Sequence, residues 1–543
     1  MTSRYSSSSL LQSILVRGAD LKTAQIIATA TVSGLAALYS LYYYHTTYSV
    51  QKKRHNGFKE VKIIPSPKGA LPFFGHIFQI DKDLPAVKFH EWFYKYGPLV
   101  RINIGSKEWI LIGDSYIANE LLKTKGALTS GRPYHPFTTD YYALNRRGMT
   151  FTDADKRWKR SRAAAQSLLS SKAVDRLTKT LEIEATQATQ RLLEETAKNG
   201  QVNIVKHMQL AALNVILRIC FGVYGESVDD FFIQSIVETI DITIKWGAPS
   251  EDLLGTVLPG GISSVFSYFT GREQRYREFT YEKRDPLFRQ LISKALESDT
   301  DCFAKDLYRI KGELELEDDD ILVLLLDLIN AGTDPTAITL TWAFVILCHH
   351  KDVQKKIQKE IDMFIAAHDG RLPNFEEREC LPYLLSVQKE CMRYRPSNHI
   401  GLPHKAIKDF KFNGYSIRKG SVLLACTYSL NLSPDRYQNP EKFLPDRYAG
   451  DPRPLSVSVN SSIDTRDQFM FGWGRRICPG VNLADAETFN FWVRIFATST
   501  IEPPLNKQGV PMYPNLDACY DGGLVVTPID ANLRFVKRRD RLV

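Results

Sequence analysis

Residues 471–480 read FGWGRRICPG, and this stretch of the 543-residue chain decides what the fold must hold. Gly472 and Gly474 can adopt the backbone angles of a tight turn and let the backbone come close to a flat ligand. Cys478 is followed by an apolar helical pattern, so backbone N–H groups at the start of that helix would stabilise its thiolate. A thiolate is what a soft metal centre or a haem iron requires. The stretch therefore predicts a metal or haem ligand at Cys478; the alternative is a structural cysteine in a glycine-rich turn.

The composition is that of a large globular protein. Hydrophobic residues make up 44% and charged residues 24%, which excludes a disordered, collagenous or coiled-coil chain. The chain carries 70 basic and 61 acidic residues without a nucleic-acid-binding motif, so no nucleic-acid partner is predicted. Its eight cysteines are scattered, which excludes a zinc ribbon or a small disulfide scaffold.

The N-terminal part predicts a membrane anchor. Residues 24–44 contain no charged side chain, and a helix of that length spans the hydrocarbon layer of a bilayer. Lys52, Lys53 and Arg54 follow it, which places the rest of the chain in the cytosol. The alternative is a cleaved signal peptide. We therefore divide the chain into a tail (1–23), a transmembrane anchor (24–44), a proline-rich linker (45–75) and a catalytic domain (76–543).

The remaining chain predicts a mainly α fold with a small β-rich part. Alternating apolar patterns indicate strands near Leu99–Ile104, 109–112, 410–417 and 422–426, and helical patterns dominate 154–368.

The loop at 471–480 resembles the haem-binding loop of the cytochrome P450 family, FxxGxRxCxG. Phe471, Gly474, Arg476, Cys478 and Gly480 fill its fixed places. The resemblance implies the cytochrome P450 fold, an α-helical haem domain with a small β-sheet region behind an N-terminal transmembrane helix. It also implies haem b as cofactor and Cys478 as the metal ligand, with Arg476 on a haem propionate and Phe471 beside the sulfur. Gly472 joins these cofactor-binding residues.

Two further motifs match the family in the expected order. Glu390 and Arg393 form an ExxR pair that shares one helix face, and Arg447 follows in a PxRx-like segment; the resemblance implies a buried ion network with a structural role. Trp158 and Arg162 match WxxxR, which implies a second propionate clamp.

One long apolar helix is predicted over 318–350, with AGTDPT (331–336) in its middle. The resemblance implies that Asp334, Thr336 and Thr333 deliver protons. Pro335 departs from the family pattern, which has a threonine there. Because proline has no N–H, we expect the helix to kink or open at the carbonyl of Ala331.

The resemblance also suggests which segments line a lipophilic substrate pocket. Its predicted residues are Tyr134, Phe137, Asn330, Ala331, Ile400 and Leu524. His135 and His399 are candidate polar anchors, the alternative being histidines solvated on loops.

These features predict a haem-thiolate monooxygenase of the endoplasmic reticulum membrane, anchored once with its catalytic domain in the cytosol, that hydroxylates a steroid, terpenoid, fatty acid or xenobiotic. The implied electron donor is NADPH-cytochrome P450 reductase, with cytochrome b5 as a second candidate, docking on a basic patch at Lys156, Arg157, Lys159 and Arg160. Pro335 keeps open a reductase-independent isomerase, dehydratase or peroxygenase. A non-catalytic haem-binding membrane protein is the third possibility.

Overall fold

The computed structural model describes residues 62–71, 74–81, 83–105, 107–248, 251, 267 and 270–539, together with Gly34. The predicted tail and, apart from Gly34, the predicted anchor lie outside these residues. Contacts divide the chain into two units, and the unit made of Ile63–Ala70 and Phe74–Val543 holds nearly all of the described part. The paragraphs below describe that unit by itself.

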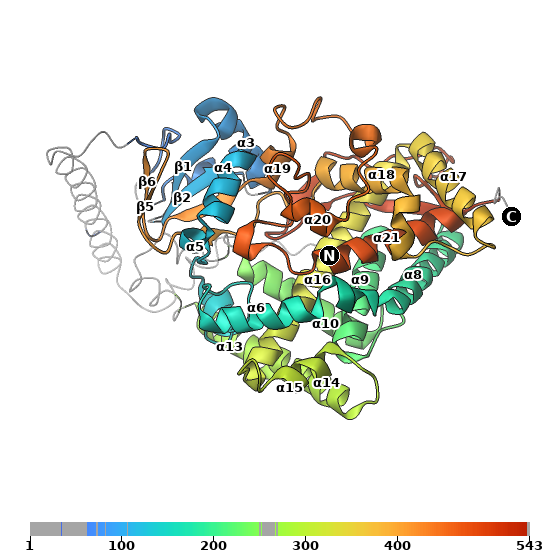
Figure 1. Cartoon of the computed structure of the whole chain (residues 1–543), viewed down its shortest axis with the longest axis horizontal. Helices are drawn as coiled ribbons and strands as arrows, with labels where there is room; N and C mark the ends of the chain where they lie inside the picture. The colour runs from blue at the N-terminus through green and yellow to red at the C-terminus, as the bar shows by residue number, and fades with distance from the viewer. Residues whose placement is uncertain are drawn as a thin grey trace, which may run out of the picture. The chain divides into compact units, whose positions relative to one another are not determined.

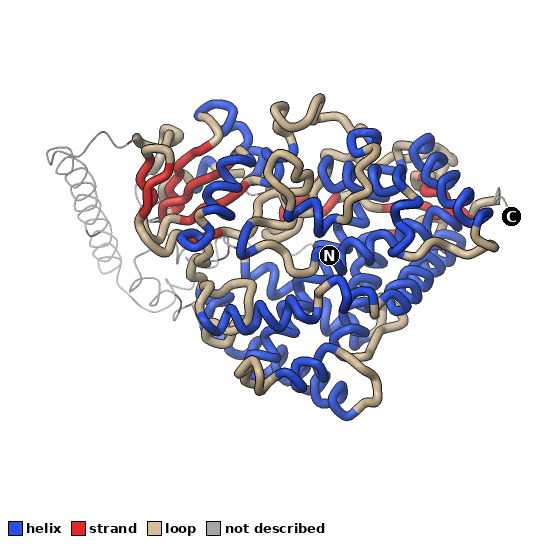
Figure 2. Tube along the Cα trace, in the orientation of Figure 1, coloured by secondary structure: helices blue, strands red, loops and turns tan. Residues whose placement is uncertain are grey.

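The predicted strands are confirmed, and those near 99–104, 109–112 and 422–426 join a fourth strand, which was not predicted, in one sheet (Figure 2). Its order is β1 (Leu99–Ile104), β2 (Lys107–Ile112), β7 (Val422–Ala425) and β4 (His404–Lys405). β1 and β2 form an antiparallel hairpin, whereas β7 lies parallel to β2 after a crossover of about 300 residues. All four residues of β7 are buried, as expected of a strand covered on both faces.

Three smaller sheets complete the β part. β5 (Phe410–Phe412) and β6 (Tyr415–Ile417) form a hairpin whose turn, Asn413-Gly414, has positive φ at both residues. β3 (Val202–Asn203), β11 (Asn532–Lys537) and β8 (Ser499–Glu502) pair in that order. β9 (Cys519–Asp521) pairs with β10 (Val526–Pro528) in a hairpin.

Helices make up most of the unit (Figure 1). The α-helices other than the central pair are α3 (Pro85–Tyr96), α4 (Ser115–Ala118), α5 (Gly126–Thr129), α6 (Lys156–Leu168), α7 (Ser171–Asp175), α8 (Thr178–Asn199), α10 (Phe231–Gly247), α13 (Arg272–Arg277), α14 (Asp285–Glu297), α15 (Phe303–Ile310), α17 (Lys351–Ala367), α18 (Pro382–Tyr394), α19 (Thr427–Asn431), α20 (Leu455–Asn460) and α21 (Val481–Thr498). The 3₁₀ and π turns are η1 (Ile77–Gln79), η2 (Asn119–Thr124), η3 (Phe137–Tyr142), η4 (Glu278–Arg284), η5 (Phe375–Cys380), η6 (Pro445–Tyr448) and η7 (Gly474–Arg476).

The central pair is α9 (Ile204–Phe221) and α16 (Asp318–Cys348), which pack along each other. Both are long and apolar enough to cross a membrane, but 72% and 78% of their apolar windows are buried inside the protein, so they are core helices. A capping box between Glu317 and Asp320 fixes the start of α16. The predicted opening of this helix at Pro335 is wrong, because α16 continues unbroken from Asp318 to Cys348.

Two large apolar clusters meet along α16. Its first half, from Ile321 to Ile329, packs with α9, α10, η3 and η4. Its second half, from Ala337 onward, packs with α17, α18 and α21. Residues 330–336 belong to neither cluster, so the AGTDPT motif lies at the junction of the two cores.

Candidate active site

Ala331 interrupts the burial of α16 at this junction. It is exposed, although α16 is buried on both sides of it from Ile321 to Ile329 and from Thr336 onward. The neighbouring elements therefore leave the side chain of Ala331 uncovered at this point of the helix. Gly332, beside it, packs against Ile216 of α9, where a Cβ would come within 2.5 Å of the Ile216 side chain.

The turn predicted for the cysteine loop is confirmed. Gly472 and Gly474 have φ of +76° and +52°, and the backbone N–H of Cys478 donates to the carbonyl of Phe471 over 2.8 Å. A Cβ on Gly474 would lie 2.4 Å from the carbonyl oxygen of Leu122. The close backbone approach at Gly474 is therefore to η2, and glycine is needed there for packing within the protein.

Cys478 lies two residues before Gly480, the residue that caps α21. Desolvation raises the pKa of its thiol, while the N–H of Gly480 and the charge of Arg162 act in the opposite direction. The residue nevertheless keeps part of its surface open. Coordination to a metal would deprotonate this thiol outright.

Arg476 and Trp158 both donate a hydrogen bond to one backbone carbonyl, that of Met149. The indole Nε1–H of Trp158 donates to the carbonyl of Met149 over 3.0 Å, and Nη1 of Arg476 donates to the same oxygen over 2.9 Å. The Arg476 guanidinium also lies 4.6 Å from the Trp158 ring and donates to the carbonyls of Ser130 and Thr152. The single donor of Trp158 is thus already used, and so are most of those of Arg476.

Arg162 differs from these two side chains. Its Nη2 donates to the carbonyl of Ile477, one residue before the cysteine. Its Nε and Nη1 have no acceptor among the hydrogen bonds of the described residues. Of the three predicted clamp residues, Arg162 keeps the most donors for an anionic ligand group.

Asp327 is a site residue that sequence reasoning missed. This buried carboxylate of α16 accepts from the hydroxyl of Tyr142 over 3.0 Å and from the backbone N–H of Met149 over 2.7 Å and of Thr150 over 3.3 Å. It therefore fixes the Met149 segment whose carbonyl holds Trp158 and Arg476. A lone acid in an apolar helix, four residues before Ala331, was the available signal.

The predicted proton-delivery residues lie in different settings. The carboxylate of Asp334 is buried and accepts from Nε2 of Gln209 on α9 over 3.0 Å. Burial raises its pKa to about 6; the Gln209 hydrogen bond lowers the pKa and the charge of Asp241 raises it. The hydroxyl of Thr333 is tied to the carbonyl of Ile329 over 2.8 Å, whereas Thr336 is buried without a hydrogen bond of that kind in the described part.

The predicted pocket residues do not all converge. Phe137 has no exposed surface and packs in an aromatic cluster with Trp246, Tyr276 and Phe279, at ring distances of 5.4, 5.1 and 6.1 Å. The prediction that Phe137 lines a cavity is therefore wrong in this arrangement. Tyr134 is exposed, with its hydroxyl donating to Asp140, so it lies outside an enclosed pocket.

The other predicted pocket residues are half-buried, except the exposed Ala331. The amide of Asn330 donates to the carbonyl of Leu326 over 2.8 Å, and the carbonyl of Leu524 accepts from Asn398 over 2.9 Å. Ile400 packs against the cluster that covers the sheet. His399 is buried, and desolvation lowers its pKa to about 3, so it is a neutral core histidine and not a solvated one.

Glu390, Arg393 and Arg447 meet as the ExxR spacing predicts. Arg393 donates to both carboxylate oxygens of Glu390 over 2.7 and 2.8 Å, and Nε of Arg447 donates over 3.1 Å. The N–H of Leu444 supplies a fourth donor over 2.8 Å. All the acceptor capacity of a fully buried carboxylate is thereby used.

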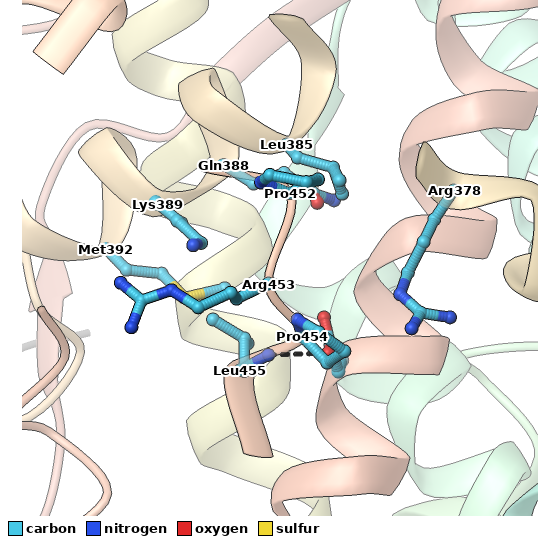
Figure 3. Close-up of a pocket in the computed structure, with 10 residues that line it drawn as sticks. Arg378, Leu385, Gln388, Lys389, Met392, Pro452, Arg453, Pro454 and Leu455 are labelled. Carbon is cyan, nitrogen blue, oxygen red and sulfur yellow. Dashed lines mark hydrogen bonds between the residues drawn. The ribbon is translucent and has the colours of Figure 1, made fainter. Parts of the chain in front are cut away.

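A small polar cavity lies beside this network, between α18 and α21. Figure 3 shows Gln388, Lys389 and Arg378 around it, with the N–H of Leu455 donating to Asp485 over 2.8 Å. Its volume of about 10 Å³ holds one water molecule at most. Burial raises the pKa of Asp485 to about 6. The cavity is too small for a substrate.

The predicted basic patch on α6 is only half available. Arg157 pairs with Glu317 over 3.2 Å, and Arg160 pairs with Glu315. Both acids come from the segment that starts α16, so these charges are neutralised within the protein. Lys156 and Lys159 remain exposed.

Comparisons with known proteins identify the class. The cytochrome P450 monooxygenase virE of Hypocrea virens is 27% identical over 486 residues, which cover 88% of this chain and 86% of that protein. A steroid 17-alpha-hydroxylase/17,20 lyase of Ictalurus punctatus is 26% identical over 473 residues, covering 83% and 88%. A zebra fish cytochrome P450 structure with abiraterone has the same fold, with a TM-score of 0.68 at 23% identity, over 84% of this chain and 100% of that one.

The chain is therefore a haem-dependent monooxygenase. It belongs to the cytochrome P450 family, whose sequence profile matches residues 65–528.

The residues present fit the haem-thiolate iron group that the family implies. Cys478 offers a desolvated thiol on a partly exposed residue, and Ala331 leaves a part of α16 uncovered. Arg162 offers unused cationic donors next to the cysteine loop, as a carboxylate-bearing ligand requires. This donor set suits a flat, anionic, metal-bearing group.

Proposed function

We propose that the chain binds haem b through the thiolate of Cys478 and inserts one oxygen atom of O2 into a lipophilic small molecule, such as a steroid, terpenoid, fatty acid or xenobiotic. The observation that carries this proposal is Cys478, a partly exposed residue whose desolvated thiol lies just before a buried helix. When bound, the haem supplies O2 binding and, through its thiolate ligand, O–O cleavage.

The chain's own residues would hold the group in place. We assign Arg162 to a haem propionate, because it has unused donors. Arg476 and Trp158 hold the Met149 segment in position through their hydrogen bonds to its carbonyl. Phe471 and Gly480 shape the cysteine loop through the carbonyl that accepts from Cys478 and the N–H that faces its sulfur. The small side chain of Ala331 would leave room for the haem beside α16.

We assign proton supply to Asp334 and Thr336. With a pKa of about 6, roughly a tenth of the Asp334 carboxyl groups carry a proton at pH 7, so the group can both give and accept one near neutrality. Pro335 adds no hydroxyl, and Thr333 is tied to its own helix. Thr336 is therefore the hydroxyl of this motif best able to take part.

The electron donor and the cellular location are further parts of this proposal. NADPH-cytochrome P450 reductase, with cytochrome b5 as a further donor, would dock where Lys156, Lys159 and Arg475 are exposed, since opposite charge steers such encounters. Residues 24–44 would anchor the chain in the endoplasmic reticulum membrane with the catalytic domain in the cytosol. The lipophilic substrate class is consistent with the steroid hydroxylase among the relatives.

The test uses the full-length, haem-loaded protein in lipid nanodiscs with NADPH, a microsomal reductase and a panel of lipophiles that includes steroids. Under ¹⁸O2, mass spectrometry should find a product that carries one labelled oxygen atom and disappears without reductase. Cys478→Ser should abolish both the haem-thiolate absorption of the reduced protein with carbon monoxide and the product.

The second candidate is a reductase-independent isomerase, dehydratase or peroxygenase, which Pro335 favours. Turnover of hydroperoxides without reductase, and no labelled product with it, would establish that candidate. Haem binding without any turnover would leave a non-catalytic haem protein.

A further inference from the structure

The carboxyl group of Asp334 is held by a neighbouring helix. Nε2 of Gln209, on α9, donates to its Oδ1 over 3.0 Å. Asp334 is 7% exposed, whereas Gln209 is half-buried and so reaches from the carboxyl group toward accessible space. Gln209 matches no motif of the family that the sequence showed.

A primary amide suits a carboxyl group that changes its protonation state. Its Nε2–H₂ donates to the ionised carboxylate, and its Oε1 can accept from the neutral acid after the amide rotates. Leucine could fill the same volume but could do neither. Gln209 can therefore keep Asp334 in one place before and after a proton leaves.

Asp241 is the second group that acts on Asp334. It is an exposed residue of α10, and its negative charge acts on Asp334. Asp241 and the Gln209 amide are the two groups outside α16 that act on Asp334 in the described part of the chain.

We propose that Gln209 is a positioning residue for Asp334, and that it holds the Asp334 carboxyl group in one place while that group gives up a proton and takes up another. The inference rests on the proposed proton supply by Asp334. One proton leaves the carboxyl group toward the site and one enters from solvent, so the residue returns to its starting charge. The Gln209 amide holds the Asp334 carboxyl group in the orientation that receives the incoming proton.

The experiment measures the titration of Asp334 in the resting, haem-loaded full-length protein by infrared difference spectroscopy. Asp334→Asn identifies the carboxyl band by removing it. Gln209→Leu takes away a donor to the ionised form and should raise the titration midpoint by roughly one pH unit. Asp241→Asn takes away a like charge and should lower the midpoint by a few tenths of a unit, an effect that 1 M salt should remove.

Gln234→Leu is the matched control, because it makes the same substitution at an exposed position of α10 and should leave the midpoint unchanged. In turnover, Gln209→Leu should also increase several-fold the share of NADPH consumed without product, with haem content unchanged. Gln209→Asn, which retains the amide group, should restore part of that coupling.

Midpoints that stay at the wild-type value in both variants, or that move in the same direction, would overturn the inference. The titration is read without turnover, so it stands apart from the test of the proposed function. A protein that makes no oxygenated product but shows both opposite shifts would refute the monooxygenase proposal and leave the pairing of Asp334 with Gln209 intact.

Discussion

Replacing Glu390 by alanine should cost the protein a large part of its stability. Glu390 and Arg393 have no exposed side-chain surface, and their nitrogen and oxygen atoms lie 2.7 Å apart. The substitution leaves the Arg393 charge buried, with only the carbonyls of Asn431, Pro440 and Lys442 as partners. Breaking a buried ion pair from one side costs about 3–5 kcal/mol. A folded domain has only about 5–15 kcal/mol of stability in total.

Glu91→Ala is the matched control. Lys88 and Glu91 form an ion pair at the same i, i+3 spacing, with an N–O distance of 2.6 Å, but their side chains are 34% and 58% exposed. Water screens such a pair, and its loss should cost about 0.5 kcal/mol or less. The residue spacing and the N–O distance are thus nearly equal in the two ion pairs, and burial is what differs between them.

The assay is denaturant unfolding of the haem-loaded protein, followed by the far-ultraviolet circular dichroism of its helices. The shift in midpoint multiplied by the slope gives the change in the free energy of unfolding. Glu390→Gln retains the shape and one acceptor, so its cost should fall between the two alanine variants. A Glu390→Ala shift no larger than that of Glu91→Ala would refute the reasoning.

Three further outcomes are expected. Asp327→Ala leaves the N–H of Met149 without its acceptor, so hydrogen exchange at that amide should quicken and haem should dissociate faster. Unchanged exchange at Met149 would contradict the role of Asp327 in fixing that segment. Gly474→Ala combines a positive φ with a backbone clash at 2.4 Å and should destabilise the protein by about 1–3 kcal/mol in thermal unfolding, more than Gly200→Ala, which has a positive φ but open space around it. Burial raises the pKa of Asp485 to about 6, so ionisation of this group destabilises the folded state as the pH rises. The stability of Asp485→Asn relative to the wild type should therefore increase by up to about 3 kcal/mol between about pH 4 and pH 7. Urea titrations in which the free energies of unfolding of the two proteins run parallel with pH would contradict this.

Features set by local chain conformation could be predicted from the sequence. Gly472 has the positive φ that its turn requires, and the strand at Leu99–Ile104 has the predicted bounds. The three-residue spacing of Glu390 and Arg393 brought them onto one helix face. In each case the interacting groups lie within a turn or a strand, where spacing alone fixes which side chains are neighbours.

Predictions that depended on distant packing fared differently. Phe137 was expected to line a pocket, but its ring is enclosed by aromatic residues of α10, α13 and η4. Arg157 and Arg160 were expected to form a free basic patch, but acids near the start of α16 neutralise them. Pro335 was expected to open its helix, yet packing on both sides keeps α16 continuous.

The sequence by itself determined the cysteine loop, the helical and strand segments around it and the pairing of Glu390 with Arg393, because these depend on backbone geometry and near neighbours. Only the tertiary structure decided that Asp327 holds Met149, 178 residues earlier, and that Gln209 holds Asp334, 125 residues later. Nothing in the spacing of such residues specifies their pairing. They meet because the packing of α9, η3 and α16 buries a carboxylate, and a buried carboxylate is stable only where donors reach it.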